Sequence, residues 1–500
     1  MLPTLWYKDR LYPADWIEAE IERVLAGLQA LQCAPGDTVA AMLRNSPQYV
    51  ALVLACRRAG LYLASVNWHF KALEAQHILA DSGARALFVD ADLLEQVAGG
   101  IPDGLALVTV AGEAAAAAAP GAQDWTTFGA GLPAMPARTG LVHSAITYTS
   151  GTTGKPKGVR RIPPAAGERA AMEQRMAAVM DIVYGRGERA FLAAPIYHSA
   201  AMSYLTHFSN LGATLFLEPR FDAGRALALI EQHRITHAYL VPTMYQRLLA
   251  LPPEVRAQHD LSSLQQVAST GSPCPVPLKQ AMINWFGPVI TEAYGSSEAG
   301  YTTFADSAGW QRHPGSAGSP LPDADVRILD QDGNAAAPGE IGLIYVRQRA
   351  LSDFTYVNRP EARAALERDG LVTLGDMGYL DDDGFLYICD RKADMIISGG
   401  VNIYPAEIES VLHTMPGVAD CAVFGIPDAE FGEAIGAAVQ PLPGAQIDAA
   451  AVQVFLRERI ANYKVPRIVE VHQQLPREDT GKIFKRKLRD PYWQDQARAI

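Results

Sequence analysis

Cysteine is scarce in this sequence, and long apolar runs are missing from it. Only five of the 500 residues are cysteines, and none of them forms a Cys-x-x-Cys pair. This scatter argues against a disulfide framework or a zinc cluster and is typical of a reducing compartment, so we expect a cytoplasmic protein. No stretch reaches the roughly 18 consecutive apolar residues of a membrane-spanning helix. The N-terminus also lacks a basic region followed by an apolar run, so we expect no targeting segment.

Excess positive charge is missing as well. Lysine and arginine together number 43 against 54 aspartates and glutamates, which gives a formal charge of -11. Nucleic acids and anionic membranes are bound by basic faces, so neither is an expected partner. The basic cluster of Lys482, Lys485, Arg486, Lys487 and Arg489 is interpreted as a solvated helix start.

The chain is long enough for several folding units. Its 500 residues exceed one hydrophobic core, and at ~100–200 residues per domain about three units are expected. Apolar residues make up 49% and charged residues 19%, which is an ordinary globular composition. Helical apolar spacing over residues 16–31 and 47–59 alternates with short apolar strands at 38–43 and 84–89. This alternation predicts parallel sheets covered by helices.

Two later segments have a different character. Residues 112–140 contain six consecutive alanines and several prolines, which indicates a surface connection to which we assign no function. Asp-Gly pairs at 332–333 and 383–384 follow strand-like stretches and predict hairpins. We therefore expect a small hairpin-rich unit over residues 315–388. The remaining ~110 residues suffice for one small domain.

The most informative stretch runs from Thr149 to Gly158. It holds four hydroxyl side chains, three glycines and two lysines. Glycines let a backbone approach an anion closely, hydroxyl and N–H groups donate to phosphate oxygens, and lysines neutralise charge. The P-loop NTPase pattern does not apply, because only two residues separate Gly151 from Gly154 and Pro156 follows the lysine. We interpret the stretch as a phosphate-binding loop rather than a solvated one.

Four later segments add weaker signals. Tyr294 to Glu298 combines an aromatic ring, small residues and one carboxylate that could hold Mg²⁺. Asp376 precedes the second hairpin and could accept both hydroxyls of a ribose. The others are the charged joint 390–394 before the glycine-rich residues 398–400, and the stretch 480–482. Each of them alone could equally be a turn or a solvated surface.

The order and spacing of these segments resemble a known family. Over nearly the whole chain the sequence is similar to the adenylate-forming superfamily of acyl-CoA synthetases, peptide-synthetase adenylation domains and firefly luciferase, and most of all to acyl-CoA synthetases. Ser297 stands where the family usually has threonine, which retains the hydroxyl. The resemblance implies an α/β fold. A large N-terminal domain of two helix-covered sheets plus a small β-barrel-like hairpin unit would be followed by a small mobile α+β C-terminal domain. The implied bounds are 1–390 for the N-terminal domain that binds AMP and the acid, 391–393 for a hinge, and 394–500 for the C-terminal domain.

The resemblance also implies a reaction and its cofactors. Members of the family activate a carboxylic acid with ATP and Mg²⁺ as an acyl-adenylate, release pyrophosphate, and pass the acyl group to a thiol such as coenzyme A. Glu298 and Ser297 would hold the metal, and Lys482 would bridge the carboxylate and the α-phosphate. The residues expected to bind ATP or AMP are Thr149, Ser150, Gly151, Thr152, Thr153, Gly154, Lys155, Lys157, Gly271, Ser272, Pro273, Tyr294, Gly295, Ser296, Ser297, Asp376 and Arg391.

Residues 195–199 match the family's segment at the acyl pocket. His198 is expected beside the acid carboxylate, although a lone histidine of this kind is often a structural core residue. The expected pocket residues are His198, Ser199, Met202, Val241 and Thr243. A second substrate carboxylate would need a buried arginine or lysine, and none stands in these stretches. We therefore expect a monocarboxylic fatty or aromatic acid rather than a dicarboxylic one.

The small C-terminal domain is expected to rotate between the two half-reactions, as the family does. One orientation would bring in Lys482, which we count with Glu298 and His198 as catalytic. The other would present Ser398, Gly399 and Gly400 to the thiol of coenzyme A. Lys392 and Ala393 are expected at the hinge. Because Ala393 departs from the aspartate or lysine usual there, the pivot itself stays open.

Other functions remain open at this point. A stand-alone adenylating enzyme could load a separate carrier protein, although we expect no fused carrier domain after Lys482. A luciferase-like oxidation is a more distant alternative. A non-catalytic relative that binds nucleotide or acyl-CoA is disfavoured, because it would not need to keep Lys482, Glu298, Asp376 and both loop lysines. A homodimer is also left open as an assembly.

Overall fold

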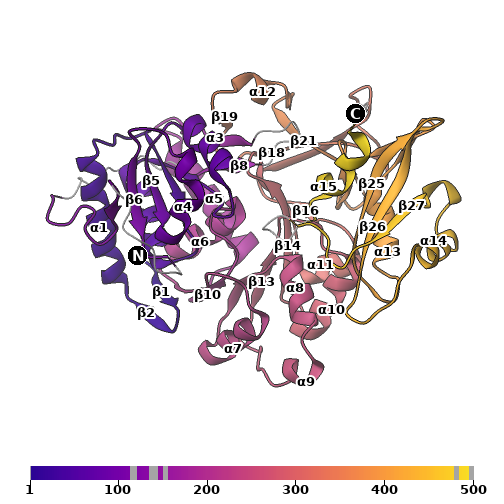
Figure 1. Cartoon of the computed structure of the whole chain (residues 1–500), viewed down its shortest axis with the longest axis horizontal. Coiled ribbons are helices and arrows are strands. Elements are labelled where there is room, and N and C mark those ends of the chain that lie inside the picture. The colour runs from indigo at the N-terminus through magenta and orange to yellow at the C-terminus, as the bar shows by residue number, and fades with distance from the viewer. Residues whose placement is uncertain (1, 113–120, 134–144, 150–155, 478–482, 495–500) are drawn as a thin grey trace.

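The computed structural model describes residues 2–112, 121–133, 145–149, 156–477 and 483–494 (Figure 1). Four sheets are found in this part of the chain. Three lie before residue 392 and the fourth after it. The elements run from the indigo N-terminal part on the left of Figure 1 to the yellow C-terminal part on the right. No helix among the described residues is both long and apolar enough to cross a membrane.

The first sheet has nine strands in the described residues, in the order β16-β15-β14-β13-β12-β10-β11-β1-β2. Its central strands pair in parallel, whereas β2, β15 and β16 are antiparallel to their neighbours. The strands are β1 (Thr4–Tyr7), β2 (Arg10–Tyr12), β10 (Arg189–Leu192), β11 (Thr214–Leu217), β12 (His237–Tyr239), β13 (Gln266–Ser269), β14 (Ile290–Ser296), β15 (Gly300–Ala305) and β16 (Ser319–Pro320).

The second sheet has the order β19-β9-β8-β4-β3-β5-β6-β7. β8 and β9 form an antiparallel hairpin, β19 pairs with β9 at the edge of the sheet, and the expected phosphate loop connects β8 to β9. The strands are β3 (Thr38–Met42), β4 (Tyr62–Ser65), β5 (Ala84–Asp90), β6 (Ala106–Val110), β7 (Gln123–Asp124), β8 (Ala145–Thr149), β9 (Lys157–Arg161) and β19 (Phe354–Tyr356).

Helices cover both sheets, as the alternation of helix and strand signals predicts. The helices before residue 392 are α1 (Ala14–Ala30), α2 (Pro47–Ala59), α3 (Ala72–Ser82), α4 (Leu94–Val97), α5 (Arg169–Tyr184), α6 (Ser199–Leu211), α7 (Ala223–His233), α8 (Pro242–Leu249), α9 (Pro253–Arg256), α10 (Val276–Phe286), α11 (Ser307–Arg312) and α12 (Pro360–Ala364). Successive residues of β3 face two different cores. Val39 and Ala41 join a cluster shared with the first sheet, and Ala40 and Met42 join one under α3.

The third sheet is the predicted hairpin-rich unit. It contains β17 (Ala324–Leu329), β18 (Gly342–Gln348), β20 (Glu367–Arg368), β21 (Leu371–Leu380) and β22 (Leu386–Arg391). The Asp-Gly turn at 383–384 joins β21 to β22. The turn at 332–333 follows β17. Only an isolated β-bridge between Leu329 and Ala335 closes this turn, and β18 then pairs with β17 along its length. The α/β fold class of the chain is thereby confirmed.

The fourth sheet belongs to a smaller unit near the C-terminus. It has the order β24-β23-β26-β25 with β27 beside β26. Its elements are β23 (Ile396–Ser398), β24 (Val401–Ile403), α13 (Pro405–Leu412), β25 (Val418–Asp428), β26 (Gly432–Pro441), α14 (Ala449–Arg457), β27 (Ile468–Val471) and α15 (Lys485–Arg489). This unit has its own apolar cluster between the sheet and helices α13 and α14.

The segment predicted as a surface connection is only partly so. Within its described residues, Trp125 and Phe128 are buried in the main core. The Phe128 ring lies so close to Gly27 on α1 that a Cβ there would sit about 2.4 Å from it. Arg23 of the same helix donates a hydrogen bond of 2.9 Å to the Phe128 carbonyl. The expectation of a surface connection was wrong for these two aromatic residues, because it was based on the alanine and proline content of the segment.

Candidate active site

The carboxyl ends of four parallel strands gather most of the residues expected to bind the nucleotide and the acid. β10, β12, β13 and β14 are parallel neighbours. The segment 195–199 follows β10, Val241 and Thr243 follow β12, residues 271–273 follow β13, and Tyr294 lies near the end of β14. In open α/β sheets, ligands bind at this edge. Residues scattered over about a hundred positions thus share one edge of a sheet.

An asparagine that the sequence does not single out holds the segment before His198. Asn45 is buried, and its side-chain amide donates to the carbonyl of Ala194 at 2.9 Å. The amide N–H of Ile196 donates back to the Asn45 side-chain oxygen at 2.9 Å. His198 then forms the N-cap position of α6. The loop that carries the expected acid-binding histidine is therefore fixed by buried hydrogen bonds at its start.

Ser199 and Ser297 join the expected acid pocket to the expected metal motif. The Ser297 hydroxyl donates to the Ser199 hydroxyl oxygen at 2.9 Å. Ser199 begins α6, and Ser297 directly follows β14. Met202, on the same helix, is buried. The structure therefore brings together residues that are about a hundred positions apart in the chain.

Glu298 lies in a tight turn after β14. The hydroxyl oxygen of Ser296 accepts the amide N–H groups of Glu298 at 3.1 Å and Ala299 at 3.0 Å. The Glu298 side chain is buried, and its Oε1 accepts a hydrogen bond of 3.0 Å from the Tyr356 hydroxyl. Burial, and then the charge of Glu298, raise the pKa of Tyr356 above its usual value, so the phenol is the donor. The carboxylate is thus held in one orientation.

This single carboxylate fits a magnesium ion that arrives with a nucleotide. Among the described residues there is no group of three histidine, cysteine or acidic side chains that could cage a metal. Mg²⁺ keeps several waters and is commonly bound through one or two carboxylates together with substrate phosphates. A buried carboxylate held by Tyr356, whose ring is next to Lys157 at the flank of the expected phosphate loop, meets that requirement without a cage. Ser297 is its neighbour in the turn.

Asp376 is the second buried carboxylate of the site. Its Oδ2 accepts a hydrogen bond of 2.6 Å from the Tyr294 hydroxyl, and its Oδ1 lies 3.4 Å from Nε of Arg391. Asp376 and Arg391 are direct cross-strand partners on β21 and β22. Burial, and then the charge of Asp376, raise the pKa of Tyr294. The sequence analysis proposed these three residues separately, and the fold places them in one cluster.

We expect Asp376→Asn to weaken ATP binding by roughly 10- to 100-fold. Hydrogen bonds to a charged group are worth about 1.5–3 kcal/mol, and each 1.4 kcal/mol is about tenfold in affinity. The measurement is the KM for ATP in acid-dependent ATP–pyrophosphate exchange. Asp383→Asn, in the exposed turn of the same hairpin, is the matched control. An unchanged KM in Asp376→Asn would contradict a ribose contact.

The expected phosphate loop is described only at its flanks. Thr149 and Lys157 are cross-strand partners at the ends of β8 and β9. Ser150, Gly151, Thr152, Thr153, Gly154 and Lys155 lie outside the described residues. The Lys157 ammonium sits 5.2 Å from the centroid of the Tyr356 ring. The flank of the loop is therefore next to the tyrosine that holds Glu298.

Lys482 also lies outside the described residues, but the helix after it does not. On α15, the Lys485 ammonium pairs with Glu409 at 2.8 Å, and Arg489 lies 3.4 Å from Asp394. The expectation of a solvated basic cluster was thus wrong for Lys485 and Arg489, because acidic groups of the same small unit pair with them. Lys487 is exposed, as expected.

The expected hinge lies between β22 and β23. The Lys392 amide N–H donates to the carbonyl of Gly375 at 2.7 Å, and Ala393 follows it. Ser398 ends β23, and Gly399 and Gly400 form the turn to β24 with φ of 57° and 79°. Ser398 and Gly399 line a pocket whose other walls include Phe431, Tyr463, Arg457 and Arg467.

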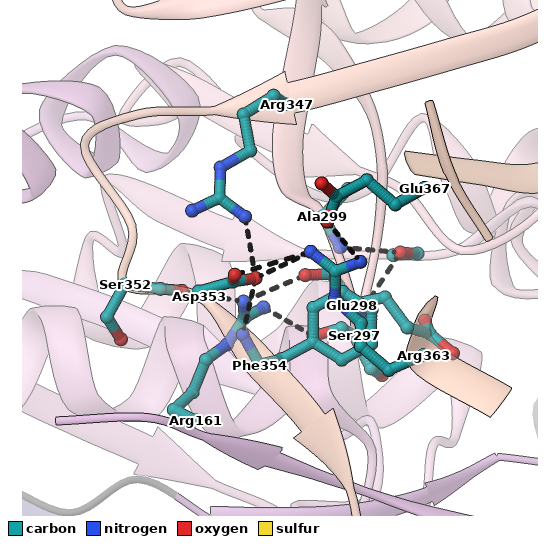
Figure 2. A network of polar contacts seen from close by, with 11 residues as sticks. Arg161, Ser297, Glu298, Ala299, Arg347, Ser352, Asp353, Phe354, Arg363 and Glu367 are labelled. Carbon is teal, nitrogen blue, oxygen red and sulfur yellow. Dashed lines mark hydrogen bonds and ion pairs between the residues drawn. The ribbon is translucent and has the colours of Figure 1, made fainter. Parts of the chain in front are cut away.

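Two further residues near the site escaped the sequence analysis. Arg161, at the end of β9, donates hydrogen bonds to the carbonyls of Ser297 and Glu298 (Figure 2). Tyr356 donates a hydrogen bond to the Glu298 carboxylate. A usable signal existed for Arg161. Strand alternation puts it on the same face as Val159, which is buried. No local signal points from Tyr356 to Glu298.

Comparisons with known proteins find relatives over most of the chain. The family model described as the AMP-binding enzyme matches residues 17–353, and that of the AMP-binding enzyme C-terminal domain matches residues 407–482. The chain is 37% identical to a feruloyl-CoA synthase from Amycolatopsis sp over 95% of this chain and 92% of the relative. It is 32% identical to a fatty acid–acyl-carrier-protein ligase from Streptomyces coeruleorubidus over 100% of this chain and 95% of that one.

A solved structure with bound nucleotide is similar as well. It is the O-succinylbenzoate coenzyme A synthetase from Bacillus subtilis in complex with ATP and magnesium ion. The TM-score is 0.81 at 29% identity, and the match covers 97% of this chain and 96% of that chain. Both the sequence and the architecture are thus shared over nearly the full length.

Proposed function

The chain belongs to the AMP-binding enzyme family, and on this premise we propose that it is an ATP-dependent ligase that joins a monocarboxylic acid to coenzyme A. The observation that carries this proposal is that two buried carboxylates, Asp376 and Glu298, both lie beside the C-terminal end of β14. Tyr294, near the end of β14, donates to Asp376, and Glu298 lies in the turn directly after that strand. One carboxylate is suited to a ribose and the other to a metal held on phosphates.

The first half-reaction joins two anions. A carboxylate oxygen of the acid attacks the α-phosphorus of ATP, the bond from that phosphorus to the bridging oxygen breaks, and pyrophosphate leaves. In the proposed site, residues 149–157 hold the β- and γ-phosphates, Asp376 and Arg391 orient the ribose side, and Lys482 bridges the acid and the α-phosphate. Gly271, Ser272 and Pro273 line the base. Catalysis of this kind is mostly positioning and charge stabilisation.

Magnesium fits this site through Glu298. When bound, the ion would supply positive charge to the triphosphate. Ser296 and Tyr356 keep the carboxylate in place through their hydrogen bonds to the turn and to Oε1. Ser297, whose hydroxyl reaches Ser199, ties the same turn to the acid side.

The second half-reaction needs the smaller unit. We infer domains of 1–390 and 394–500 with a hinge at 391–393. This division is supported by β22 ending at Arg391 and β23 beginning at Ile396. Rotation about Lys392 and Ala393 would withdraw Lys482 and present the turn at 398–400, so that the thiol of coenzyme A attacks the acyl carbon and AMP leaves. The pocket beside Ser398 and Gly399 supports the placement of coenzyme A there.

The proposed acid class rests on the lack of lysine and arginine among the residues of the expected acid pocket. His198, Ser199, Met202, Val241 and Thr243 present no lysine or arginine to a second carboxylate, which favours a monocarboxylic fatty or aromatic acid. The relatives named above include one for feruloyl-CoA and one for fatty acids, so both classes belong in the test. The second relative delivers to a carrier protein, and a carrier protein is the alternative acceptor.

The deciding experiment measures AMP and pyrophosphate release from ATP across short, medium, long-chain, aromatic and dicarboxylic acids. Each acid is tested with coenzyme A, with a phosphopantetheinylated carrier protein, and with neither. We expect turnover with one monocarboxylic class that depends on coenzyme A. Pyrophosphate formed once per enzyme without a response to coenzyme A would instead support carrier loading. Strongest turnover with a dicarboxylic acid would contradict the proposed acid class.

Location and assembly are finer proposals. All five cysteines are free in the structure, which supports a reducing cytoplasmic location. A homodimer stays a prediction, and light scattering on the purified chain measures it directly.

A further inference from the structure

Arg161 connects the strand after the phosphate loop to the turn that carries Glu298. Its Nη1 donates to the Glu298 carbonyl at 2.8 Å and to the Ser352 carbonyl at 3.1 Å. Its Nη2 donates to the Ser297 carbonyl. One guanidinium therefore holds the backbone of both residues expected at the metal (Figure 2).

Among the described residues Arg161 has no ion pair, and its hydrogen bonds go to the backbone carbonyls of Ser297, Glu298 and Ser352. The neighbouring carboxylate, Asp353, is already bound by Nη1 of Arg347 at 2.7 Å and Nη2 of Arg363 at 3.0 Å (Figure 2). Burial lowers the pKa of Arg161 to about 10, so the guanidinium stays protonated at neutral pH. A buried guanidinium that donates its hydrogen bonds to backbone carbonyls indicates a positioning role, because the planar group can bind several acceptors at once.

Tyr356 holds the same turn from the next strand. β9 and β19 are antiparallel partners, with Phe354 opposite Arg161 and Tyr356 opposite Val159. Arg161 contacts the backbone of the turn, and Tyr356 contacts its carboxylate at 3.0 Å. Both contacts come from strands of the second sheet, whereas the turn belongs to the first sheet. The two contacts therefore set the position of one sheet's turn relative to the other sheet's phosphate loop.

We propose that Arg161, assisted by Tyr356, is a positioning residue that fixes the Ser297–Glu298 turn relative to the phosphate-loop hairpin. The inference rests on the proposed function and extends it to residues outside the expected site. Mg²⁺ demands near-ideal octahedral geometry, so a carboxylate that shares the ion with phosphates has little freedom to shift. Releasing the turn from β9 would leave both the loop and the carboxylate intact but misaligned.

The test compares ATP binding with and without Mg²⁺, measured by titration calorimetry on the full chain. We expect the wild-type protein to bind ATP more tightly when Mg²⁺ is present. Arg161→Met should lose about 10- to 100-fold of that gain, the usual effect of removing a group that orients a metal ligand. Its affinity for ATP without the metal should stay unchanged. Tyr356→Phe should move in the same direction by a smaller factor.

Arg160→Met is the matched control. Arg160 is the neighbour of Arg161 on the same strand, but its guanidinium lies 4.2 Å from the centroid of the Tyr62 ring. This substitution removes the same charge and a similar side chain without touching the turn. We expect the Mg²⁺-dependent gain of Arg160→Met to match that of the wild type. An equal loss in Arg160→Met and Arg161→Met would overturn the proposal, because it would show a general effect of charge or of strand stability.

A double-mutant cycle shows whether Arg161 acts through Glu298. In a Glu298→Gln background, Arg161→Met should cause little further loss, because residues that act through one another are not additive. Full additivity would overturn the proposal. Arg161→Lys keeps the charge and should recover part of the Mg²⁺-dependent gain in ATP affinity. It replaces Arg161→Met in the same test if that variant does not fold. If the wild type turned over none of the acids in the panel, the result would count against the proposed function. If the wild type were active and Arg161→Met kept the full Mg²⁺-dependent gain in ATP affinity, the result would count against this inference alone.

Discussion

Lys482→Ala should lower the rate of acyl-adenylate formation by about 10²–10³-fold, the usual cost of removing one preorganised charge from a transition state. Two anions meet in this step, and the lysine would neutralise both the acid carboxylate and the α-phosphate. The measurement is single-turnover formation of acyl-adenylate at saturating ATP and acid. Because the effect is on charge development, kcat should fall far more than the KM for ATP rises.

Two controls separate this role from a general effect of the basic C-terminal segment. Lys487→Ala removes an exposed lysine five residues away and should behave as the wild type. Lys482→Ala should also still convert chemically synthesised acyl-adenylate and coenzyme A to product, since the proposed second step withdraws this residue. Equal losses in both half-reactions would contradict a role confined to adenylation.

Glu298→Gln should reduce ATP–pyrophosphate exchange by about 10²–10³-fold at a fixed Mg²⁺ concentration. Glutamine keeps the size of the side chain and can still accept the hydrogen bond from Tyr356, which in the native protein is 3.0 Å long. The substitution therefore removes mainly the negative charge that a divalent ion requires. Part of the activity should return as Mg²⁺ is raised, because weaker binding is offset by concentration.

The measurement for Glu298→Gln is a Mg²⁺ titration of the exchange rate. Glu340→Gln, a substitution at an exposed glutamate before β18, serves as the control and should leave the titration unchanged. A Glu298→Gln protein whose Mg²⁺ midpoint equals that of the wild type would assign this carboxylate a structural role instead. The unfolding temperature should be measured alongside, because Glu298 is buried.

Local signals in the sequence placed many elements well. The helix expected over residues 47–59 is α2, with the Ser46 hydroxyl oxygen accepting the Tyr49 amide N–H at the start and Gly60 in the left-handed region at the end. The helical spacing over residues 16–31 corresponds to α1, where Ile17, Ile21 and Val24 are buried. These predictions succeed because capping groups and apolar spacing lie within a few residues of one another.

The sequence also named the chemistry, because the family's motifs are short and contiguous. The density of glycine, hydroxyl and lysine from Thr149 to Gly158 points to phosphate whatever the fold around it is. Tyr294 to Glu298 and Asp376 could be named as candidates from their order along the chain. Their mutual contacts could not, because no local pattern shows that Tyr294 donates to Asp376 or that Ser297 reaches Ser199.

Only the tertiary structure decided which residues hold the site in place. Arg161, Tyr356 and Asn45 act on segments far from them in the chain, and the two aromatic anchors Trp125 and Phe128 lie in a stretch whose composition suggests a surface loop. The physical reason is the range of the interactions. Secondary-structure propensity, capping and anion-binding chemistry depend on residues that are close in the sequence. A buried hydrogen bond between two sheets depends instead on how those sheets pack against each other.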